Sequence, residues 1–234
     1  MVIKENNFIN FLEEMMKKDL IFTDGSTLAL GNIYCIAKNY SKHAAEMQST
    51  VPKSPSVFIK PSTAYIKNNE NIVIPDISQM VHHEVELVVV IGKDCINVTK
   101  DDAENYIAGY AVGIDVTLRD IQNKAKESGS PWAICKGFAT SAPISDVIPI
   151  NTLSEKIPFF DLSFSVNGVT KQQGNTKDME RSVGVLIEYL SKIFHLHQGD
   201  CIFTGTPEGV GQIVKGDTLT AELVGYAKLK VNVE

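Results

Sequence analysis

Two acidic residues stand two positions apart at the start of an apolar run, in the segment from His82 to Ile91. Glu84 and Glu86 should point from the same face of a predicted strand, because successive side chains of a strand alternate between its faces. Burying two anions beside such a run is costly unless something neutralises them, and a divalent cation would do so. The spacing permits a metal site, but it also fits a strand whose acidic end emerges into solvent.

A third acid, Asp115, lies at the end of another apolar stretch, from Tyr110 to Val116. Three carboxylates without a thiolate predict an oxygen-ligated hard cation, Mg²⁺ or Mn²⁺, that keeps positions open for water or substrate. Such a cation could chelate the carboxylate and the neighbouring 2-oxo oxygen of a pyruvate-like acid, and so stabilise an enolate. A small 2-oxo acid is thus one partner that such a site could bind, and it is the partner that the family resemblance described below implies.

A second candidate pair, His43 and Glu46, lies in a segment predicted to be an exposed helix or an ordered loop. A spacing of three would bring the two side chains together on one helical face, where Glu46 could orient His43 and raise its basicity. Such a pair could act as a general base that activates water. Without further support, an exposed His/Glu pair is more commonly a weak surface interaction.

The elements that must position these residues are mostly strands. Apolar runs between turn residues predict strands over residues 32–37, 57–59, 86–91, 110–116, 162–166, 201–204 and 227–233. Helical spacing predicts helices over residues 6–20, 100–108, 121–126 and 182–191. This order is not regularly βαβ, which disfavours a Rossmann sheet or a TIM barrel. We therefore expect an α+β chain, mainly β with a few helices, in which an N-terminal helical extension over residues 1–31 precedes one catalytic domain over residues 32–234.

Composition narrows the class of partner and the compartment. The formal net charge of −6 and the pI near 5.4 argue against a broad basic surface for nucleic acid or anionic lipid. The four cysteines form no CxxC pair, which favours reduced, mostly buried thiols. No apolar run approaches the roughly 20 residues that span a bilayer, and no signal peptide is recognised. The prediction is a cytoplasmic protein that binds neither nucleic acid nor membrane.

Six ordered segments resemble motifs of the fumarylacetoacetate hydrolase family. They are Asn39 to Glu46 (similar to Asn-Tyr-x-x-His-x-x-Glu), Phe58 to Pro61 (similar to Phe-x-Lys-Pro), His82 to Leu87, Gly113 to Asp120, Lys136 to Phe138 and Thr204 to Gly211. The resemblance covers nearly the whole chain except the first thirty residues. It is strongest to the compact members, which include acylpyruvate hydrolases and oxaloacetate decarboxylases or tautomerases. Ala37 departs from the pattern, because many relatives carry a glycine there, and only glycine tolerates a positive φ cheaply.

The resemblance implies a mixed β-roll, commonly a homodimer, in which Glu84, Glu86 and Asp115 bind Mg²⁺ or Mn²⁺. It also assigns Lys136 to the same pocket. There the ammonium could pair with the substrate carboxylate or with the developing enolate. Without the surrounding motif, a surface lysine would be the ordinary interpretation.

Three more residues are candidates for substrate binding. Arg119 and Gln122 lie just beyond the third acid and could contact the substrate or support the ligand shell. The glycine-rich segment from Thr204 to Gly211 should form a tight loop that brings backbone N–H groups and Thr206 near the substrate carboxylate.

The expected reaction is divalent-metal-dependent hydrolysis of a carbon–carbon bond in an acylpyruvate-type 2,4-dioxo acid, similar to fumarylpyruvate or acetylpyruvate, with release of pyruvate. His43 and Glu46 would activate the water. The alternative is oxaloacetate decarboxylation or keto–enol tautomerisation, which needs the same enolate-stabilising metal but no hydrolytic water. Isomerisation of a dienoic hydroxy diacid, or a catalytically silent metabolite-binding protein, are the remaining alternatives.

Overall fold

The structure is a computed structural model that describes residues 18–47 and 49–234. Its largest sheet has six strands in the order β12-β9-β8-β15-β3-β4. In that order the strands span Ile148–Pro149, Ile107–Ile114, Val85–Ile91, Cys201–Phe203, Ile33–Ala37 and Ser56–Lys60. All residues of β8 are buried, and its alternate side chains enter two separate apolar cores. A central strand covered on both faces accounts for the unbroken valine-rich run in the sequence.

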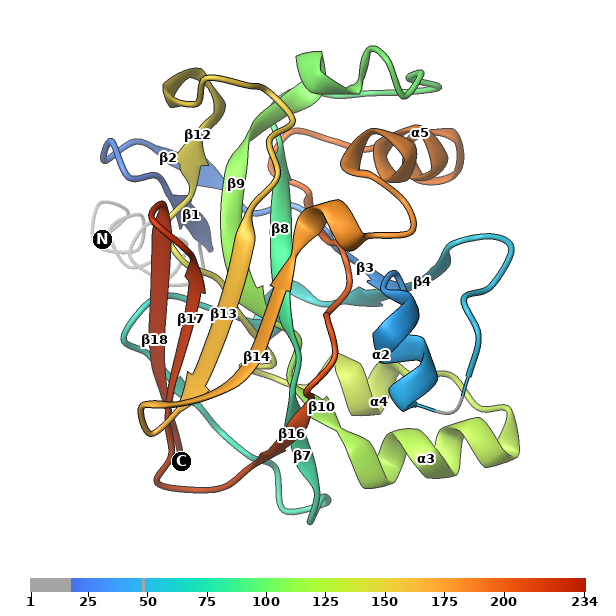
Figure 1. The fold of residues 1–234 in the computed structure, drawn as a ribbon, viewed down its shortest axis with the longest axis vertical. Coiled ribbons are helices and arrows are strands. Elements are labelled where there is room, and N and C mark those ends of the chain that lie inside the picture. Colours follow the sequence, from blue (N-terminus) through green and yellow to red (C-terminus); the bar gives the residue numbers. More distant parts are fainter. Residues whose placement is uncertain (1–17, 48) are drawn as a thin grey trace, which may run out of the picture.

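A second sheet of five strands packs against one face of the first (Figure 1). Its order is β14-β13-β17-β18-β6, with the strands spanning Val169–Asn175, Asp161–Val166, Thr218–Leu223, Ala227–Val233 and Asn71–Ile72. Buried and exposed residues alternate along β13, β17 and β18, so that one face turns inward and the other toward solvent. Leu87 of the first sheet shares one core with Phe164 and Leu229 of the second.

Three smaller sheets complete the strand arrangement of the described residues. β1 (Asp19–Ile21) and β2 (Thr27–Ala29) form an antiparallel hairpin around a turn at Asp24 and Gly25, a residue pair typical of turns. β5 (Tyr65–Ile66) pairs in parallel with β11 (Ala142–Pro143). The third sheet has the order β10-β7-β16, with strands at Thr117–Leu118, Val81–His83 and Gly211–Ile213. Because β7 leads into β8 and β10 follows β9, this sheet continues the central strand pair beyond its end.

Three of the helices gather near that same end of the large sheet (Figure 1). They are α2 (Ser41–Glu46), α3 (Arg119–Ser128) and α4 (Ala133–Lys136), whereas α5 (Val183–Phe194) lies farther along the sheet. The longest of the three, α3, ends at Gly129, whose φ of +67° gives the left-handed cap that terminates many helices. In the described part of the chain, no helix has the length and apolar character needed to cross a membrane.

The predicted fold class, mainly β with a few helices, is confirmed, and each predicted strand lies within a few residues of an observed one. The helix predicted over residues 100–108 is wrong. A 3₁₀ turn occupies Ala103–Tyr106, and β9 begins at Ile107, which pairs with Ile91. Pairing with the neighbouring strand outweighs helix propensity here, because intrinsic propensities differ by less than about 1 kcal/mol per residue.

Most of the helix predicted over residues 6–20 lies outside the described residues. Its last two positions, Asp19 and Leu20, belong to strand β1, so the prediction is wrong there. Leu20 and Phe22 are buried in the second core, which ties the β1–β2 hairpin to the large sheet. The division of the chain between residues 31 and 32 stays a prediction. All four cysteines are free and buried, as expected.

Candidate active site

Three acidic side chains meet at the end of the two central strands. Glu84 lies between β7 and β8, Glu86 lies in β8, and Asp115 directly follows β9. The two strands pair antiparallel, with Val85 opposite Ile114, and the Asp115 N–H donates to the Glu84 carbonyl oxygen at 2.8 Å. One carboxylate oxygen from each acid lies within 4.8 Å of the others, and all three side chains are buried. Strand pairing thus adds Asp115 to the two acids that alternation placed together.

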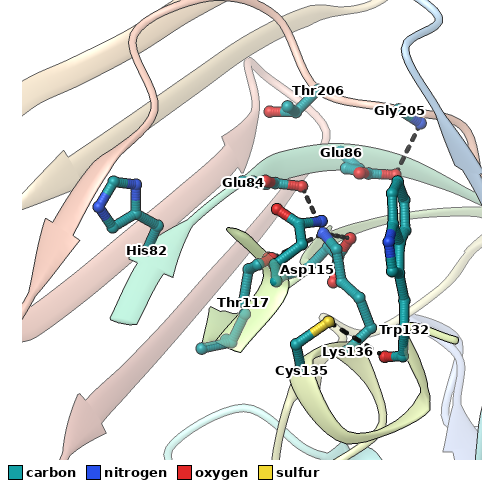
Figure 2. Close-up of polar contacts among 12 residues, drawn as sticks. His82, Glu84, Glu86, Asp115, Thr117, Trp132, Cys135, Lys136, Gly205 and Thr206 are labelled. Atoms are coloured by element: carbon teal, nitrogen blue, oxygen red, sulfur yellow. Dashed lines mark hydrogen bonds and ion pairs between the residues drawn. The ribbon is translucent and has the colours of Figure 1, made fainter. Parts of the chain in front are cut away.

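Two cations balance part of this negative charge. Lys136, at the end of α4, donates from Nζ to Glu84 Oε2 at 2.7 Å and to Asp115 Oδ2 at 2.5 Å (Figure 2). The same ammonium donates to Thr117 Oγ1 at 2.6 Å. Arg119, the first residue of α3, pairs with Glu84 Oε1. Burial would raise the pKa of Glu84, but the charges of Lys136 and Arg119 outweigh it and lower that pKa.

A third cation, Lys60, lies beneath the acids and is only 1% exposed. Its Nζ is 2.8 Å from Asp115 Oδ1. It also donates to the backbone carbonyl oxygens of Val116, Lys136 and Ser141. The ammonium therefore connects the end of β4 to the segments that carry Asp115 and Lys136. The sequence interpretation gave Lys60 no role, although a lysine in the apolar segment from Phe58 to Pro61 was a signal, since lysine is almost never buried unless paired.

Unlike Glu84 and Asp115, Glu86 has no cationic partner among the described residues. Its Oε2 accepts a hydrogen bond from the backbone N–H of Gly205 at 2.6 Å (Figure 2). Burial, together with the charges of Asp115 and Glu84, raises the pKa of Glu86. In addition, Asp115 Oδ1 is buried and meets the Lys60 ammonium as an ion pair but not in hydrogen-bond geometry. Crowded, incompletely satisfied carboxylate oxygens with no thiolate among them fit a hard divalent cation such as Mg²⁺ or Mn²⁺.

Gly205 is expected to tolerate no side chain. Its φ is +99°, and a Cβ would lie 2.8 Å from Asn39 Cβ. Gly205→Ala should lower the free energy of unfolding by about 2–4 kcal/mol through backbone strain and crowding, and should weaken Mn²⁺ binding by displacing the N–H that Glu86 accepts. Urea denaturation and calorimetric titration with Mn²⁺ measure the two effects. The matched control is Gly225→Ala, where φ is +83° but no atom lies within 4 Å, so that only about 1–2 kcal/mol should be lost. Equal losses in the two variants would contradict this role for Gly205.

The predicted His/Glu pair forms on α2 and faces the acids. His43 Nδ1 lies 3.2 Å from Glu46 Oε2. Glu46 is held in turn by the backbone N–H of Gly209, at 3.1 Å and 3.2 Å from its two carboxylate oxygens. His43 is buried and lines the same pocket as the acidic cluster, whereas Glu46 is exposed, so the pair reaches from the pocket to the surface. With Nδ1 donating to Glu46, the ring would leave Nε2 free to accept a proton.

Thr206, in the glycine-rich loop, is held at the pocket by Gln172. The sequence interpretation gave Gln172 no role. Gln172, in β14, donates from Nε2 to Thr206 Oγ1 at 2.8 Å and to the Pro207 carbonyl oxygen at 2.9 Å. Its Oε1 lies 2.8 Å from His83 Nδ1 and accepts from the Val85 N–H at 3.1 Å. Gln172 thereby links the loop to the strand that carries the acids. A single glutamine in a mostly exposed strand offers no sequence signal for such a position.

Gln122 and His82 both contact Arg119. The arginine donates from Nη1 to Gln122 Oε1 at 2.5 Å and from Nε to His82 Nδ1 at 3.4 Å. Burial and the positive charge of Arg119 lower the pKa of His82 to about 4, so this imidazole is neutral near pH 7 and accepts the bond. Gln122 therefore both orients Arg119 and lines the pocket.

The predicted site residues lie around one pocket. All of them except Glu46 line it, and Glu46 contacts it through His43. Its apolar wall comes from Ile36, Met47, Phe58 and Trp132. Ala37 also lines the pocket and ends β3, but the positive φ falls on the next residue, Lys38, at +59°. Alanine in the place of glycine therefore costs nothing in backbone strain at that position.

This fold, with buried acids and cations around one pocket, defines an enzyme with a carboxylate site suited to a divalent cation. Residues 32–234 match the model of the family described as fumarylacetoacetate (FAA) hydrolase C-terminal. The chain belongs to the fumarylacetoacetate hydrolase family, and to its compact members.

The chain is similar over most of its length to named relatives and to one solved structure. It is 42% identical over 206 residues to oxaloacetate tautomerase FAHD1, mitochondrial, of Bos taurus, covering 87% of this chain and 91% of the relative. It is 43% identical over 198 residues to oxaloacetate tautomerase YcgM of Escherichia coli, covering 85% and 90%. The crystal structure of fumarylpyruvate hydrolase from Pseudomonas aeruginosa, in complex with Mn²⁺ and pyruvate, has a TM-score of 0.88, with 34% identity and coverage of 93% and 95%.

Proposed function

We propose that this enzyme catalyses keto–enol tautomerisation of oxaloacetate, or of a closely related 2-oxo acid, with Mg²⁺ or Mn²⁺ as its cation. The observation that carries the proposal is the similarity over most of the chain to proteins named oxaloacetate tautomerases. The pocket is consistent with it, because tautomerisation requires an enolate to be stabilised and a proton to be moved, and both kinds of group line the pocket.

The cation would be held by Glu84, Glu86 and Asp115, and when bound it would supply positive charge at the 2-oxo oxygen as the enolate develops. The Lys136 ammonium adds a second positive charge at the same place. Burial alone would lower the pKa of Lys136, but the charges of Asp115 and Glu84 raise it, so the group stays protonated. Its fixed contacts with these two acids let it stabilise the oxyanion without reorganisation.

The proton at carbon 3 is assigned to His43. Glu46 engages Nδ1, so Nε2 is the atom that would take this proton from carbon 3 of the keto form, while the enolate oxygen takes a proton from solvent water to give the enol. In the reverse direction the enol oxygen loses its proton to water and Nε2 returns a proton to carbon 3. Because Glu46 is anchored by the Gly209 N–H, the imidazole keeps one tautomer and one orientation. Arg119, fixed by Glu84 and Gln122, is placed to bind the carboxylate next to the 2-oxo group.

A second candidate is hydrolysis of an acylpyruvate such as fumarylpyruvate. It is favoured by the similarity to a fumarylpyruvate hydrolase and by the His43–Glu46 pair, which is also what activation of a hydrolytic water requires. Decarboxylation of oxaloacetate would release CO₂ and leave the enolate of pyruvate, which the same positive charges would stabilise. Breaking that carbon–carbon bond needs no base, and the enolate would take its proton at carbon 3 from solvent.

A parallel assay separates these reactions. Decay of enol-oxaloacetate, release of pyruvate from oxaloacetate and cleavage of fumarylpyruvate and acetylpyruvate should be followed with Mg²⁺, with Mn²⁺ and with a chelator. We expect acceleration of the enol decay, lost with the chelator. Cleavage of an acylpyruvate with no acceleration of enol decay would replace the tautomerase proposal with the hydrolase.

Replacing His43 should distinguish tautomerisation and acylpyruvate hydrolysis, which need a base, from decarboxylation, which does not. His43→Ala is expected to slow tautomerisation and any acylpyruvate hydrolysis by about 10²–10⁴-fold, while metal-promoted decarboxylation is retained. Initial rates of the three reactions on the same preparation measure this. Lys42→Ala is the matched control, since its side chain is on the same helix and is 79% exposed. Equal loss of all three activities in His43→Ala would remove the distinction.

Three expectations from the sequence stay predictions. They are a homodimer, a cytoplasmic location and the absence of nucleic-acid or membrane partners. The four buried free thiols support a reducing compartment. Sedimentation equilibrium would establish the oligomeric state.

A further inference from the structure

Two lysines line the outer part of the pocket that contains the acids. Lys38 follows β3 and is half-buried, and Lys126 lies on α3 and is exposed, so both lie toward the solvent side of the pocket. Lys126 is four residues after Gln122 and seven after Arg119, so the three side chains share one helical face. Lys126 Nζ also lies over the Trp132 ring, 5.8 Å from its centroid.

These two lysines differ from the other cations of the site. Arg119, Lys136 and Lys60 are each committed to a carboxylate of the acidic cluster. Within residues 18–47 and 49–234, by contrast, no ion pair or side-chain hydrogen bond is formed by Lys38 or Lys126. Lys38, Arg119 and Lys126 line one pocket. Partial desolvation of the ammonium, followed by the positive charges of Arg119 and Lys38, lowers the pKa of Lys126, although the residue as a whole is exposed.

Like charges gathered in a concave site are unfavourable unless an anion joins them. The pocket lining contains four cations and three acids, for a formal charge of +1, and a bound divalent cation would bring this to +3. One substrate carboxylate and its 2-oxo group satisfy the inner part of the site. The cations without a carboxylate partner, Lys38 and Lys126, are at the outer part, where a second carboxylate would lower the remaining charge from +2 to +1.

We propose that Lys38 and Lys126 form a subsite for the distal carboxylate of the substrate and so select dicarboxylic over monocarboxylic 2-oxo acids. The inference rests on the proposed function only in placing the 2-oxo end of the substrate at the acidic cluster. Lys38 and Lys126 would be specificity-determining residues. The Trp132 ring would position the Lys126 ammonium.

The test compares two amides that cannot enolise and differ in one group. N-oxalylglycine has a second carboxylate, and N-ethyloxamate has a methyl group in its place. Calorimetry on the Mg²⁺-loaded protein should show that the double variant Lys38→Gln/Lys126→Gln loses about 10–100-fold in affinity for N-oxalylglycine, as expected for a lost charged hydrogen-bond pair. Its affinity for N-ethyloxamate should be unchanged. Lys124→Gln, an exposed lysine of the same helix, is the matched control and should change neither affinity.

Kinetics give an independent readout. The double variant should raise KM for oxaloacetate by a similar factor with kcat unchanged, whereas KM for the 4-ethyl ester of oxaloacetate should stay at the wild-type value. Equal affinity of the variant and the wild type for N-oxalylglycine would overturn the subsite. If the wild type did not turn over oxaloacetate but the two amides were still discriminated through these lysines, the tautomerase proposal would fail and the subsite would stand.

Discussion

Glu86→Gln is expected to abolish stabilisation by divalent cations while leaving the metal-free protein as stable as the wild type or more stable. Glu86 is buried and has no cationic partner in the described structure, and the charges of Asp115 and Glu84 act against its ionised form. Glutamine has the same shape and keeps an oxygen that can accept the Gly205 N–H. The change thus removes one repulsive charge from the cluster and one ligand from the proposed cation site.

Thermal unfolding with and without Mg²⁺ or Mn²⁺ measures this effect. At a cation concentration about 100 times Kd, the wild type should gain about 2.7 kcal/mol, which corresponds to a rise in Tm of about 5–10 °C for a chain of this length. The variant should show no rise, and its tautomerase activity should be lost. Glu104→Gln, which alters an exposed carboxylate paired with Lys156, should retain the full metal-dependent rise. A wild-type response in Glu86→Gln would rule out Glu86 as a ligand.

Lys60→Met is expected to cause the largest loss of stability of the substitutions considered. The ammonium neutralises Asp115 and satisfies three backbone carbonyl oxygens in the interior, and methionine replaces it with an apolar group of similar length. Removing one partner of a buried ion pair leaves the other charge uncompensated, which costs about 3–5 kcal/mol. We expect Tm to fall by about 6–20 °C.

Urea denaturation should therefore show a lower transition midpoint for Lys60→Met, with loss of activity because Asp115 and Lys136 are no longer held in place. Lys215→Met, at an exposed position with no ion pair in the described structure, is the control and should stay within about 0.5 kcal/mol of the wild type. A loss as small as that of the control would mean that Lys60 does not hold the acidic cluster together.

The two substitutions separate metal binding from the support of the metal site. Glu86 faces the position proposed for the cation, whereas Lys60 lies behind Asp115 and is almost inaccessible. The fold alone does not decide which reaction follows, because relatives of this fold include both oxaloacetate tautomerases and a fumarylpyruvate hydrolase. Both of these reactions would use His43, so we propose that the choice depends on the outer part of the pocket, where Lys38 and Lys126 lie.

Short-range patterns predicted much of the strand arrangement. The apolar run of β8, the alternation along β18 and the turn at Asp24 and Gly25 each specify their local structure, because side-chain period and turn conformation are properties of neighbouring residues. The helix predicted over residues 100–108 is wrong because pairing with a distant strand decides the structure there. Ile107 is a strand residue because Ile91 pairs with it, and that partner is 16 positions away in the sequence.

The sequence by itself determined the identity of the acids, the shared face of Glu84 and Glu86, and the spacing of His43 and Glu46. The meeting of Asp115 with those acids, the burial of Lys60 beneath them, the link through Gln172 and the two unpaired lysines toward the solvent side of the pocket were decided only by the tertiary structure. The physical reason is that charge neutralisation and hydrogen-bond satisfaction act through space in a buried site. Their partners come from β4, β9, α3, α4 and β14, and no local spacing records which of these segments the folded chain brings together.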